Sequence, residues 1–195
     1  MIGIFGGSFD PPHTGHLEII QKFWGKFPKA KSLLIIPNHI SPLKDRKSAN
    51  KADILEMLQI LISSFDPQKT IIRKDEIEKG NISYTIDTLT SLKKEFADEE
   101  LFLLIGEDHL RSFHLWKDYT EILTMVRLCV YKRKLQKKLN SAKNHTPTEK
   151  IIYMDNQIIP VSSSEIREDL RNGTRNKYLP SGICNYITGK GLYSS

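Results

Sequence analysis

Short apolar runs alternate with longer amphipathic stretches along the chain. The runs have the length of strands and are nearly continuous, which is typical of strands covered on both faces. Six strands are predicted, at Ile2–Phe5, Ser32–Ile36, Thr70–Arg73, Leu101–Ile105, Arg127–Tyr131 and Ile151–Tyr153. Helices are predicted at Gly15–Trp24, Lys51–Ser63, Tyr84–Phe96, Leu115–Leu123, Ser164–Asn172 and Ile183–Thr188. This alternation predicts an α/β fold, a doubly wound parallel sheet of about six strands with helices on both faces.

The length of 195 residues favours one domain over the whole chain, 1–195. Within it, residues 132–150 are rich in lysine and are expected to form a surface connection. Residues 162–195 are expected to be a C-terminal helical part of the same domain. Gly173 is expected to end one helix there, and Pro180 to begin the last one.

Composition excludes several classes of protein. With 39% apolar and 27% charged residues, the chain is too apolar to be disordered. Cys129 and Cys184 are the only cysteines, which excludes a disulfide framework and a four-cysteine zinc site. The apolar runs are far shorter than a membrane span, and the N-terminal residues do not resemble a secretory signal. We therefore expect a soluble cytoplasmic protein with no membrane partner.

The charge balance favours an anionic ligand. Lysine and arginine number 29 against 23 aspartate and glutamate, which gives a formal net charge of +6. Nucleotide phosphates and nucleic acid would both suit this excess, so the charge alone does not separate them.

The strongest motif follows the first predicted strand and leads into the first predicted helix. It runs from Gly6 to His16 with the sequence GGSFDPPHTGH. The glycines permit close approach of the backbone to a ligand, and the helix N-terminus presents free N–H groups and a partial positive charge. His13 and His16 add hydrogen-bond donors at the same place. This segment predicts a phosphate-binding site, although a pair of histidines that only caps the helix, or a zinc pair, stays an alternative.

Two common nucleotide motifs are absent from the sequence. There is no G-x-x-x-x-G-K-[ST], which argues against P-loop kinases and GTPases. There is no G-x-G-x-x-G after the first strand, which argues against a dinucleotide site for hydride transfer.

The glycine–histidine segment closely resembles the G-G-[TS]-F-D-P-x-H-x-G-H signature of bacterial nicotinate-nucleotide adenylyltransferases, within the H-x-G-H nucleotidyltransferase superfamily. The resemblance extends in order over essentially the whole chain. It includes Ile36–Asn38 through Lys44, Ser83–Thr85 with Thr88 and Leu89, Ile105–Asp108, Phe113 with Trp116, Val161–Arg167 and Gly191–Tyr193. It implies a Rossmann-like sheet.

The resemblance also implies a reaction. Members of the family join ATP to nicotinic acid mononucleotide, which gives deamido-NAD and pyrophosphate in NAD biosynthesis. The 5′-phosphate of the mononucleotide would attack the α-phosphorus of ATP in line, with no covalent enzyme intermediate. Mg²⁺ would be carried with ATP, and no side chains that bind metal are expected.

Residue roles are implied by matching to the family motifs. The catalytic set would be His13, His16, Lys44 and Arg167. ATP would be bound by Gly6, Gly7, Phe9, His16, Gly106, Asp108, Arg133, Ser162 and Arg167. The mononucleotide would be bound by Ser8, Lys44, Tyr84, Thr85 and Trp116.

Some of these residues also have purely structural interpretations. Ser162 and Glu165 have the spacing of a capping box, and a capped helix N-terminus is also an anion site. Trp116 could simply pack in the core. Leu43 stands where the family usually has a histidine, and the residues around Arg133 differ from the usual pattern.

Other functions stay open. Pantetheine-phosphate adenylyltransferases share the H-x-G-H chemistry, and a second rival makes NAD directly from the amidated mononucleotide. A nucleic-acid-binding module is disfavoured and would show steeply salt-dependent binding. An inactive nucleotide sensor would be expected to have lost His16, Lys44 or Arg167, and all three are present. A homo-oligomer is possible.

Overall fold

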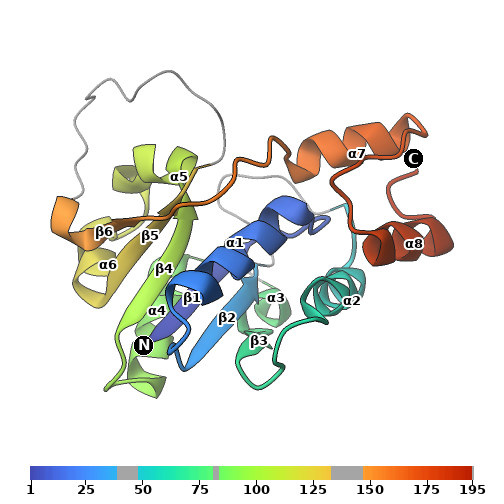
Figure 1. The fold of residues 1–195 in the computed structure, drawn as a ribbon. Helices are drawn as coiled ribbons and strands as arrows, with labels where there is room; N and C mark the ends of the chain where they lie inside the picture. The colour runs from blue at the N-terminus through green and yellow to red at the C-terminus, as the bar shows by residue number, and fades with distance from the viewer. Residues whose placement is uncertain (39–47, 81–83, 133–146, 195) are drawn as a thin grey trace.

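A six-stranded parallel sheet forms the centre of the computed structural model, which describes residues 1–38, 48–80, 84–132 and 147–194. The strand order is β3-β2-β1-β4-β5-β6, and every neighbouring pair is parallel (Figure 1). The strands are β1 Ile2–Gly7, β2 Ser32–Pro37, β3 Thr70–Ile72, β4 Leu101–Gly106, β5 Val126–Tyr131 and β6 Ile151–Tyr153. The predicted doubly wound parallel sheet is confirmed.

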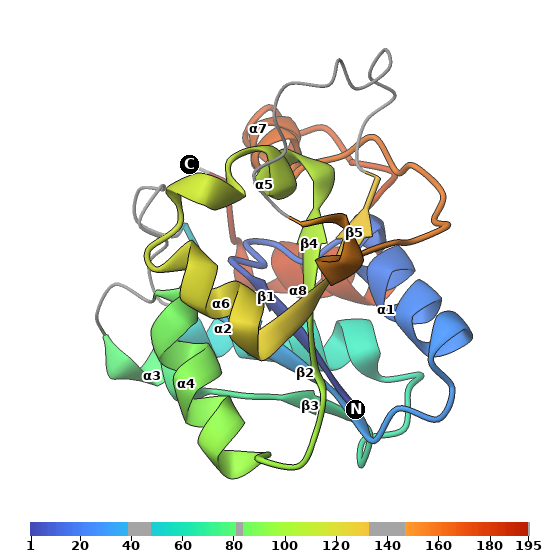
Figure 2. The same cartoon turned by 90° about the vertical axis from the view of Figure 1, so that its left-hand side faces the viewer.

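Helices cover both faces of this sheet. They are α1 Thr14–Lys26, α2 Lys51–Ile62, α3 Asp75–Lys79, α4 Thr85–Glu95, α5 Glu107–Arg111, α6 Tyr119–Met125, α7 Ser163–Arg171 and α8 Ser181–Lys190, with short 3₁₀ helices η1 Phe113–Leu115 and η2 Thr148–Lys150. Figure 2 shows α4 and α6 on the opposite side of the sheet from α1.

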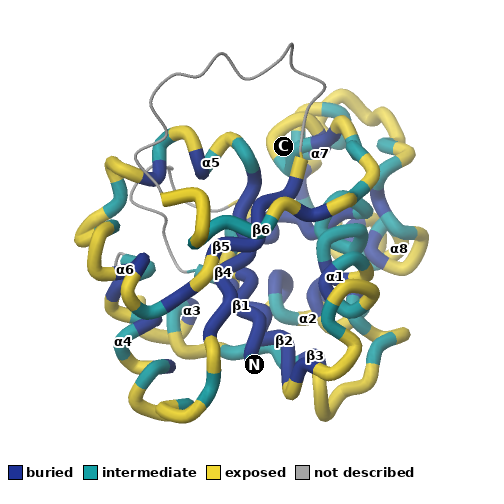
Figure 3. Tube along the Cα trace, turned by 60° about the vertical axis from the view of Figure 1, so that its left-hand side comes forward, coloured by how far each residue is buried: buried dark blue, intermediate teal, exposed yellow. Residues whose placement is uncertain are grey.

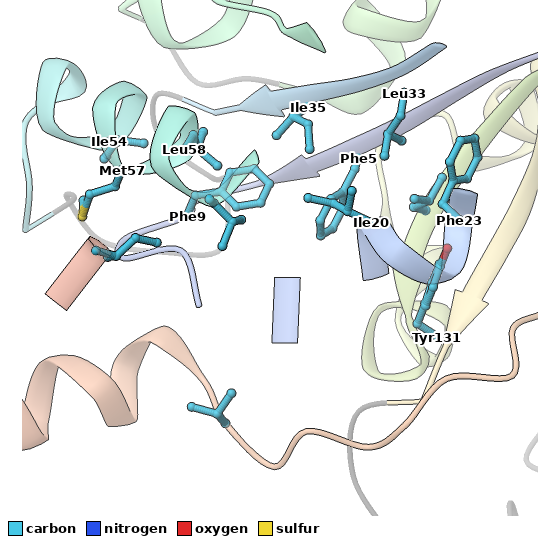
Figure 4. Close-up of a cluster of buried hydrophobic side chains, with 14 of the residues drawn as sticks. Phe5, Phe9, Ile20, Phe23, Leu33, Ile35, Ile54, Met57, Leu58 and Tyr131 are labelled. Atoms are coloured by element: carbon cyan, nitrogen blue, oxygen red, sulfur yellow. The ribbon is translucent and has the colours of Figure 1, made fainter. Parts of the chain in front are cut away.

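Alternate side chains of each central strand enter two separate cores. In β2, Leu33 and Ile35 pack with α1 and α2, whereas Leu34 and Ile36 pack with α4. Successive side chains of a strand point to opposite faces, so a nearly continuous apolar run is needed to fill both cores. Figure 3 shows the central strands as largely buried, and Figure 4 shows the core on the α1–α2 face.

Helix α1 approaches β1 closely at Gly3. A Cβ atom added to Gly3 would lie 2.5 Å from the Phe23 ring of α1. Glycine is therefore required for this helix–strand contact. The contact fixes α1, and with it the glycine–histidine segment at its N-terminus.

The predicted helices and strands are largely confirmed, with one error and two omissions. The helix predicted from Leu115 begins only at Tyr119, because Asp118 has φ of 52°, in the left-handed region. Helices α3 and α5 were not predicted, because five residues are too few for a helical apolar period to be recognised. Among the described residues, no helix has the length and apolar character needed to cross a membrane.

The strand order places a switch point between β1 and β4. The chain extends from β1 toward β3 on one side and from β4 toward β6 on the other. In open parallel sheets, ligands bind beyond the carboxyl ends of the strands at such a point. The carboxyl end of β1 is Gly6–Gly7, and that of β4 is Ile105–Gly106.

Candidate active site

The two histidines of the glycine–histidine segment build the N-terminus of α1. His13 is the N-cap, and its Nδ1 accepts a hydrogen bond from the Gly15 N–H at 3.1 Å. In return, Nδ1 of His16 accepts one from the His13 N–H, also at 3.1 Å. This is a reciprocal capping box made by two imidazoles, whose ring centroids lie 3.8 Å apart.

Capping also fixes which nitrogen of each ring carries the proton. Since Nδ1 of both neutral rings accepts a hydrogen bond, the proton of each ring must be on Nε2. The capping role considered from the sequence is thus confirmed. It is compatible with phosphate binding, because it leaves Nε2–H as the donor of each ring.

Gly15 is required by the position of the His13 ring. A Cβ atom at residue 15 would lie 2.9 Å from Cε1 and 3.0 Å from Nδ1 of His13. Any other residue would have to displace this buried imidazole, which is only 2% exposed. The glycine in the H-x-G-H pattern therefore serves the histidine that precedes it.

Phe9 and Asp10 turn the chain between β1 and α1. The Phe9 ring is buried in the core against Phe5 and His16, with centroids 5.3 and 4.9 Å away. The predicted contribution of Phe9 to ATP binding would therefore come from its backbone, which has φ of 50°.

The Asp10 carboxylate is buried and accepts three hydrogen bonds from described residues. Oδ2 accepts from the Ser48 N–H at 2.8 Å, and Oδ1 accepts from the Ala49 N–H at 3.2 Å and from the Tyr193 hydroxyl at 2.7 Å. Burial raises the pKa of Tyr193, and the negative charge of Asp10 raises it further. The tyrosine therefore stays protonated and remains a donor.

Helix α7 is held against the same turn. The Arg167 guanidinium donates to the Asp10 carbonyl oxygen at 2.6 Å and to Ser164 Oγ at 3.2 Å, and the Ser163 hydroxyl donates to the Pro11 carbonyl oxygen at 2.9 Å. Arg167 Nε is buried and has no hydrogen-bond partner in the described part of the chain.

The predicted cap of α7 is confirmed at Ser162, but the reciprocal half of the capping box is absent, because the Glu165 carboxylate accepts from the Ser162 hydroxyl and not from its N–H. Ser162 is the N-cap, and its Oγ accepts from the Glu165 N–H at 3.2 Å. The N-terminus of α7 and the capped N-terminus of α1 thus flank one turn. Anions are stabilised at both helix N-termini.

Beside this turn, a cavity of about 510 Å³ opens at the carboxyl ends of β1 and β4. It brings together the described residues of the predicted mononucleotide site, namely Ser8, Tyr84, Thr85 and Trp116. Gly6 and Gly7 of the predicted ATP site also line it. The rest of the lining is largely apolar, which suits a flat ring.

Aromatic side chains form one wall of this cavity. Trp116 is half-buried, and its ring lies 5.1 Å from Phe113 and 5.9 Å from His109, measured between centroids. Trp116 therefore both packs on the core and lines the cavity. Lys117 places Nζ 4.7 Å from the centroid of the Tyr84 ring, a cation–π contact at the cavity.

The polar groups of the cavity lie near the start of α4. Tyr84 is the N-cap of α4 and makes no side-chain capping hydrogen bond. Glu76 accepts a hydrogen bond from the Thr88 hydroxyl. Asn38 Oδ1 is buried with no hydrogen-bond partner among the described residues. No role was predicted from the sequence for Asn38, Glu76, His109 or Lys117. Asn38 lies in a segment that resembles the family, and His109 and Lys117 each directly follow one, but none of these residues has a distinctive chemical pattern of its own.

The remaining predicted site residues fall into two groups. Gly106 ends β4 and is the N-cap of α5, and Asp108 lies exposed in the first turn of α5, at the same edge of the sheet. Lys44 and Arg133 lie outside the described residues, as do Leu43 and Ser83. In the described ranges, no group of three His, Cys, Asp or Glu side chains could hold a metal ion.

Comparisons with known proteins identify the family of this chain. The cytidylyltransferase-like family model matches residues 4–169. A protein of Leptospira interrogans named "Probable nicotinate-nucleotide adenylyltransferase" is 36% identical over 100% of this chain and 97% of its own length. One of Borreliella burgdorferi with the same name is 35% identical over 98% of this chain and 96% of its own length.

Solved structures share the fold. Plasmodium falciparum nicotinic acid mononucleotide adenylyltransferase, solved in complex with NaAD, has a TM-score of 0.79 at 19% identity and covers 98% of this chain and 96% of its own. The same enzyme complexed with APC has a TM-score of 0.76. The family model covers most of the chain, and the bacterial relatives are 35–36% identical over nearly its full length. The chain therefore belongs to the cytidylyltransferase-like family and, within it, to the nicotinate-nucleotide adenylyltransferases.

Proposed function

We propose that this protein transfers the adenylyl group of ATP to nicotinic acid mononucleotide and releases deamido-NAD and pyrophosphate. One observation supports this most directly. The capped turn of residues 8–16, which offers donors to phosphate, adjoins a cavity lined by Tyr84 and Trp116, which suits a pyridine ring. A phosphate site next to an aromatic cavity is what the condensation of ATP with a pyridine mononucleotide requires.

On the ATP side, donors and one cation surround the turn. His16 Nε2–H would stabilise the α-phosphate in the transition state, with His13 beside it. Arg167 would pair with the β- and γ-phosphates through its guanidinium plane. Gly106 and Asp108 would contact the adenosine, with Asp108 accepting from a ribose hydroxyl, and Ser162 would bring the α7 N-terminus to the phosphates.

The reaction needs no general base. An oxygen of the mononucleotide 5′-phosphate, already anionic at neutral pH, would attack the α-phosphorus in line. The bond from that phosphorus to the bridging oxygen of the β-phosphate would break, and pyrophosphate would leave with Mg²⁺ that entered as part of MgATP. The enzyme would contribute orientation and charge stabilisation, which accounts for a site rich in donors.

On the mononucleotide side, the nicotinate carboxylate must be distinguished from a carboxamide. The N–H groups at the start of α4, after Tyr84, favour an anion over a neutral amide. The Lys117 ammonium adds positive charge at the same cavity. Trp116 would stack on the pyridine ring, while Ser8 and Lys44 would bind the mononucleotide phosphate.

Pyrophosphate release from MgATP tests the proposed activity. Nicotinic acid mononucleotide, nicotinamide mononucleotide and 4′-phosphopantetheine should be compared as acceptors, and we expect the acid to give the highest kcat/KM. Faster turnover of the amide or of phosphopantetheine would replace the proposal with one of the two rival reactions.

A second measurement tests the single-step mechanism. ATP made chiral at the α-phosphorus with sulfur should give a product with inverted configuration, because one in-line displacement inverts the centre. Retention would indicate two displacements and therefore an adenylated enzyme, which the mechanism excludes.

A further inference from the structure

Asp10 joins four segments that are far apart in the sequence. Its carboxylate accepts hydrogen bonds from Ser48 and Ala49, just before α2, and from the Tyr193 hydroxyl. Its carbonyl oxygen accepts one from Arg167 of α7. Asp10 itself lies three residues before His13, in the turn that carries both imidazoles. Arg167 therefore contacts Asp10 directly, and His13 and His16 follow Asp10 in the same turn.

A buried carboxylate keeps its position only while its charge is compensated. Asp10 is 4% exposed, and an unpaired buried charge is strongly unfavourable. Of the three carboxylate hydrogen bonds made by described residues, two come from the backbone N–H groups of Ser48 and Ala49. Among the described residues, Tyr193 is thus the side chain through which the position of the Asp10 carboxylate can be changed.

Tyr193 is suited to a fixed role. It is 8% exposed, and its φ of 65° lies in the left-handed region, which is uncommon for an aromatic residue. Unfavourable backbone conformations persist where the surrounding structure determines them, and they concentrate near functional sites.

We propose that Tyr193 is a positioning residue for the transfer reaction. Through Asp10, its hydroxyl holds the main chain of residues 10–13 against Arg167, and this sets the relative positions of the guanidinium and the two imidazoles. The inference rests on the proposed function for its substrates. It assigns Tyr193 to the ATP side, because neither Tyr193 nor Asp10 lines the described cavity.

The chain provides a matched control for this hydrogen bond. Tyr186 of α8 donates to Oδ1 of Asp53 in α2 at 2.8 Å, and Asp53 is 6% exposed. Tyr193 donates to Oδ1 of Asp10 at 2.7 Å. Both pairs tie the C-terminal segment to the body of the protein. Among the described residues, the Tyr186–Asp53 pair makes no hydrogen bond with the turn or with Arg167, so Tyr186 serves as the structural reference.

The test compares Tyr193→Phe with Tyr186→Phe in the full chain. For Tyr193→Phe we expect kcat/KM for ATP to fall about tenfold or more, because small displacements of groups that contact the reacting atoms lower the rate by such factors. The KM for nicotinic acid mononucleotide should change less than about twofold, since that substrate lies in the cavity. Tyr186→Phe should keep wild-type kinetics at a similar melting temperature.

Equal kcat/KM for ATP in the two variants would overturn the inference. If Tyr193→Phe melts well below the control, both substitutions are repeated in an Arg167→Ala background. Positioning predicts that Tyr193→Phe costs less there than in wild type, whereas additive losses contradict it.

Failure of the proposed function can be distinguished from failure of this inference about Tyr193. In that case the wild type itself would release no pyrophosphate with any acceptor. Calorimetric titration with MgATP would then decide the inference separately. Weaker ATP binding in Tyr193→Phe than in Tyr186→Phe would support it, and equal binding would overturn it.

Discussion

The turn that follows β1 and the cavity beside it are built in opposite ways. The turn is polar and closed. Asp10 is buried, and the carbonyl oxygens of Asp10 and Pro11 are both occupied by side chains of α7. The cavity is open and largely apolar, with Trp116 half-buried and Lys117 exposed on its wall.

The difference follows from what each region is proposed to bind. Charge that develops on a phosphoryl group is stabilised best by donors whose orientation is already fixed, because their reorganisation would add to the barrier. A flat aromatic ring is bound mainly by shape and apolar contact, and its carboxylate needs polar groups. Changes in the turn should therefore lower kcat, and changes in the cavity should raise KM for one substrate.

The largest effect is expected at His16. His16→Ala removes the donor proposed for the α-phosphate, and kcat should fall by roughly 10² to 10³, as with oxyanion-hole deletions. MgATP should still bind by calorimetry, because Arg167 and the helix N-termini remain. Loss of the Nδ1 cap should cost only about 1 kcal/mol of stability, measured by denaturant unfolding. Normal turnover in this variant would remove His16 from the catalytic set.

A substitution without any loss of a functional group should have the next largest effect. In Gly15→Ala, the new Cβ would meet the His13 ring at 2.9 Å, and we expect kcat to fall by roughly tenfold or more through displacement of the imidazoles. Gly25 is the control in the same helix, because a Cβ there meets nothing within 4 Å. Gly25→Ala should keep kcat and gain up to about 1 kcal/mol of stability. Equal kcat values in both variants would show that the position of the His13 ring does not affect catalysis.

The cavity should respond differently. Trp116→Ala removes the proposed stacking face, and KM for nicotinic acid mononucleotide should rise about tenfold, in line with aromatic stacking energies of about 1 kcal/mol plus the lost apolar contact. KM for ATP should stay nearly constant. Phe113 is fully buried beneath Trp116 and does not line the cavity, so Phe113→Leu is the control for core packing. A similar rise in both KM values for Trp116→Ala would favour packing as its main role.

The smallest effect is expected at Lys117. Lys117→Met keeps most of the side-chain length but removes the charge near Tyr84. An exposed charge contributes less than about 1 kcal/mol, so the preference for the acid over the amide should fall about threefold. The ratio of kcat/KM values for the two mononucleotides measures it, and Lys22→Met on α1 is the control for a change of net charge. An unchanged ratio would indicate that the backbone N–H groups at the start of α4, and not Lys117, distinguish the acid from the amide.

The sequence predicted the sheet, the face coverage and most helices, because nearly continuous apolar strands and amphipathic helices leave local patterns. It also predicted the cap at Ser162 and gave capping by the two histidines as an alternative interpretation, because at both places the motif and the cap are the same residues. It could not predict the contact of Tyr193 with Asp10 or of Arg167 with the Asp10 carbonyl, since these join residues more than 150 positions apart. Lys117 was missed because a single exposed lysine has no local signature.

The capping geometry of α1 has a consequence for how this enzyme becomes active. The hydrogen bonds that begin the helix are the same ones that orient both imidazole rings. Folding of the first helix and preparation of its donors are thus one event, and no ligand has to turn these rings into place.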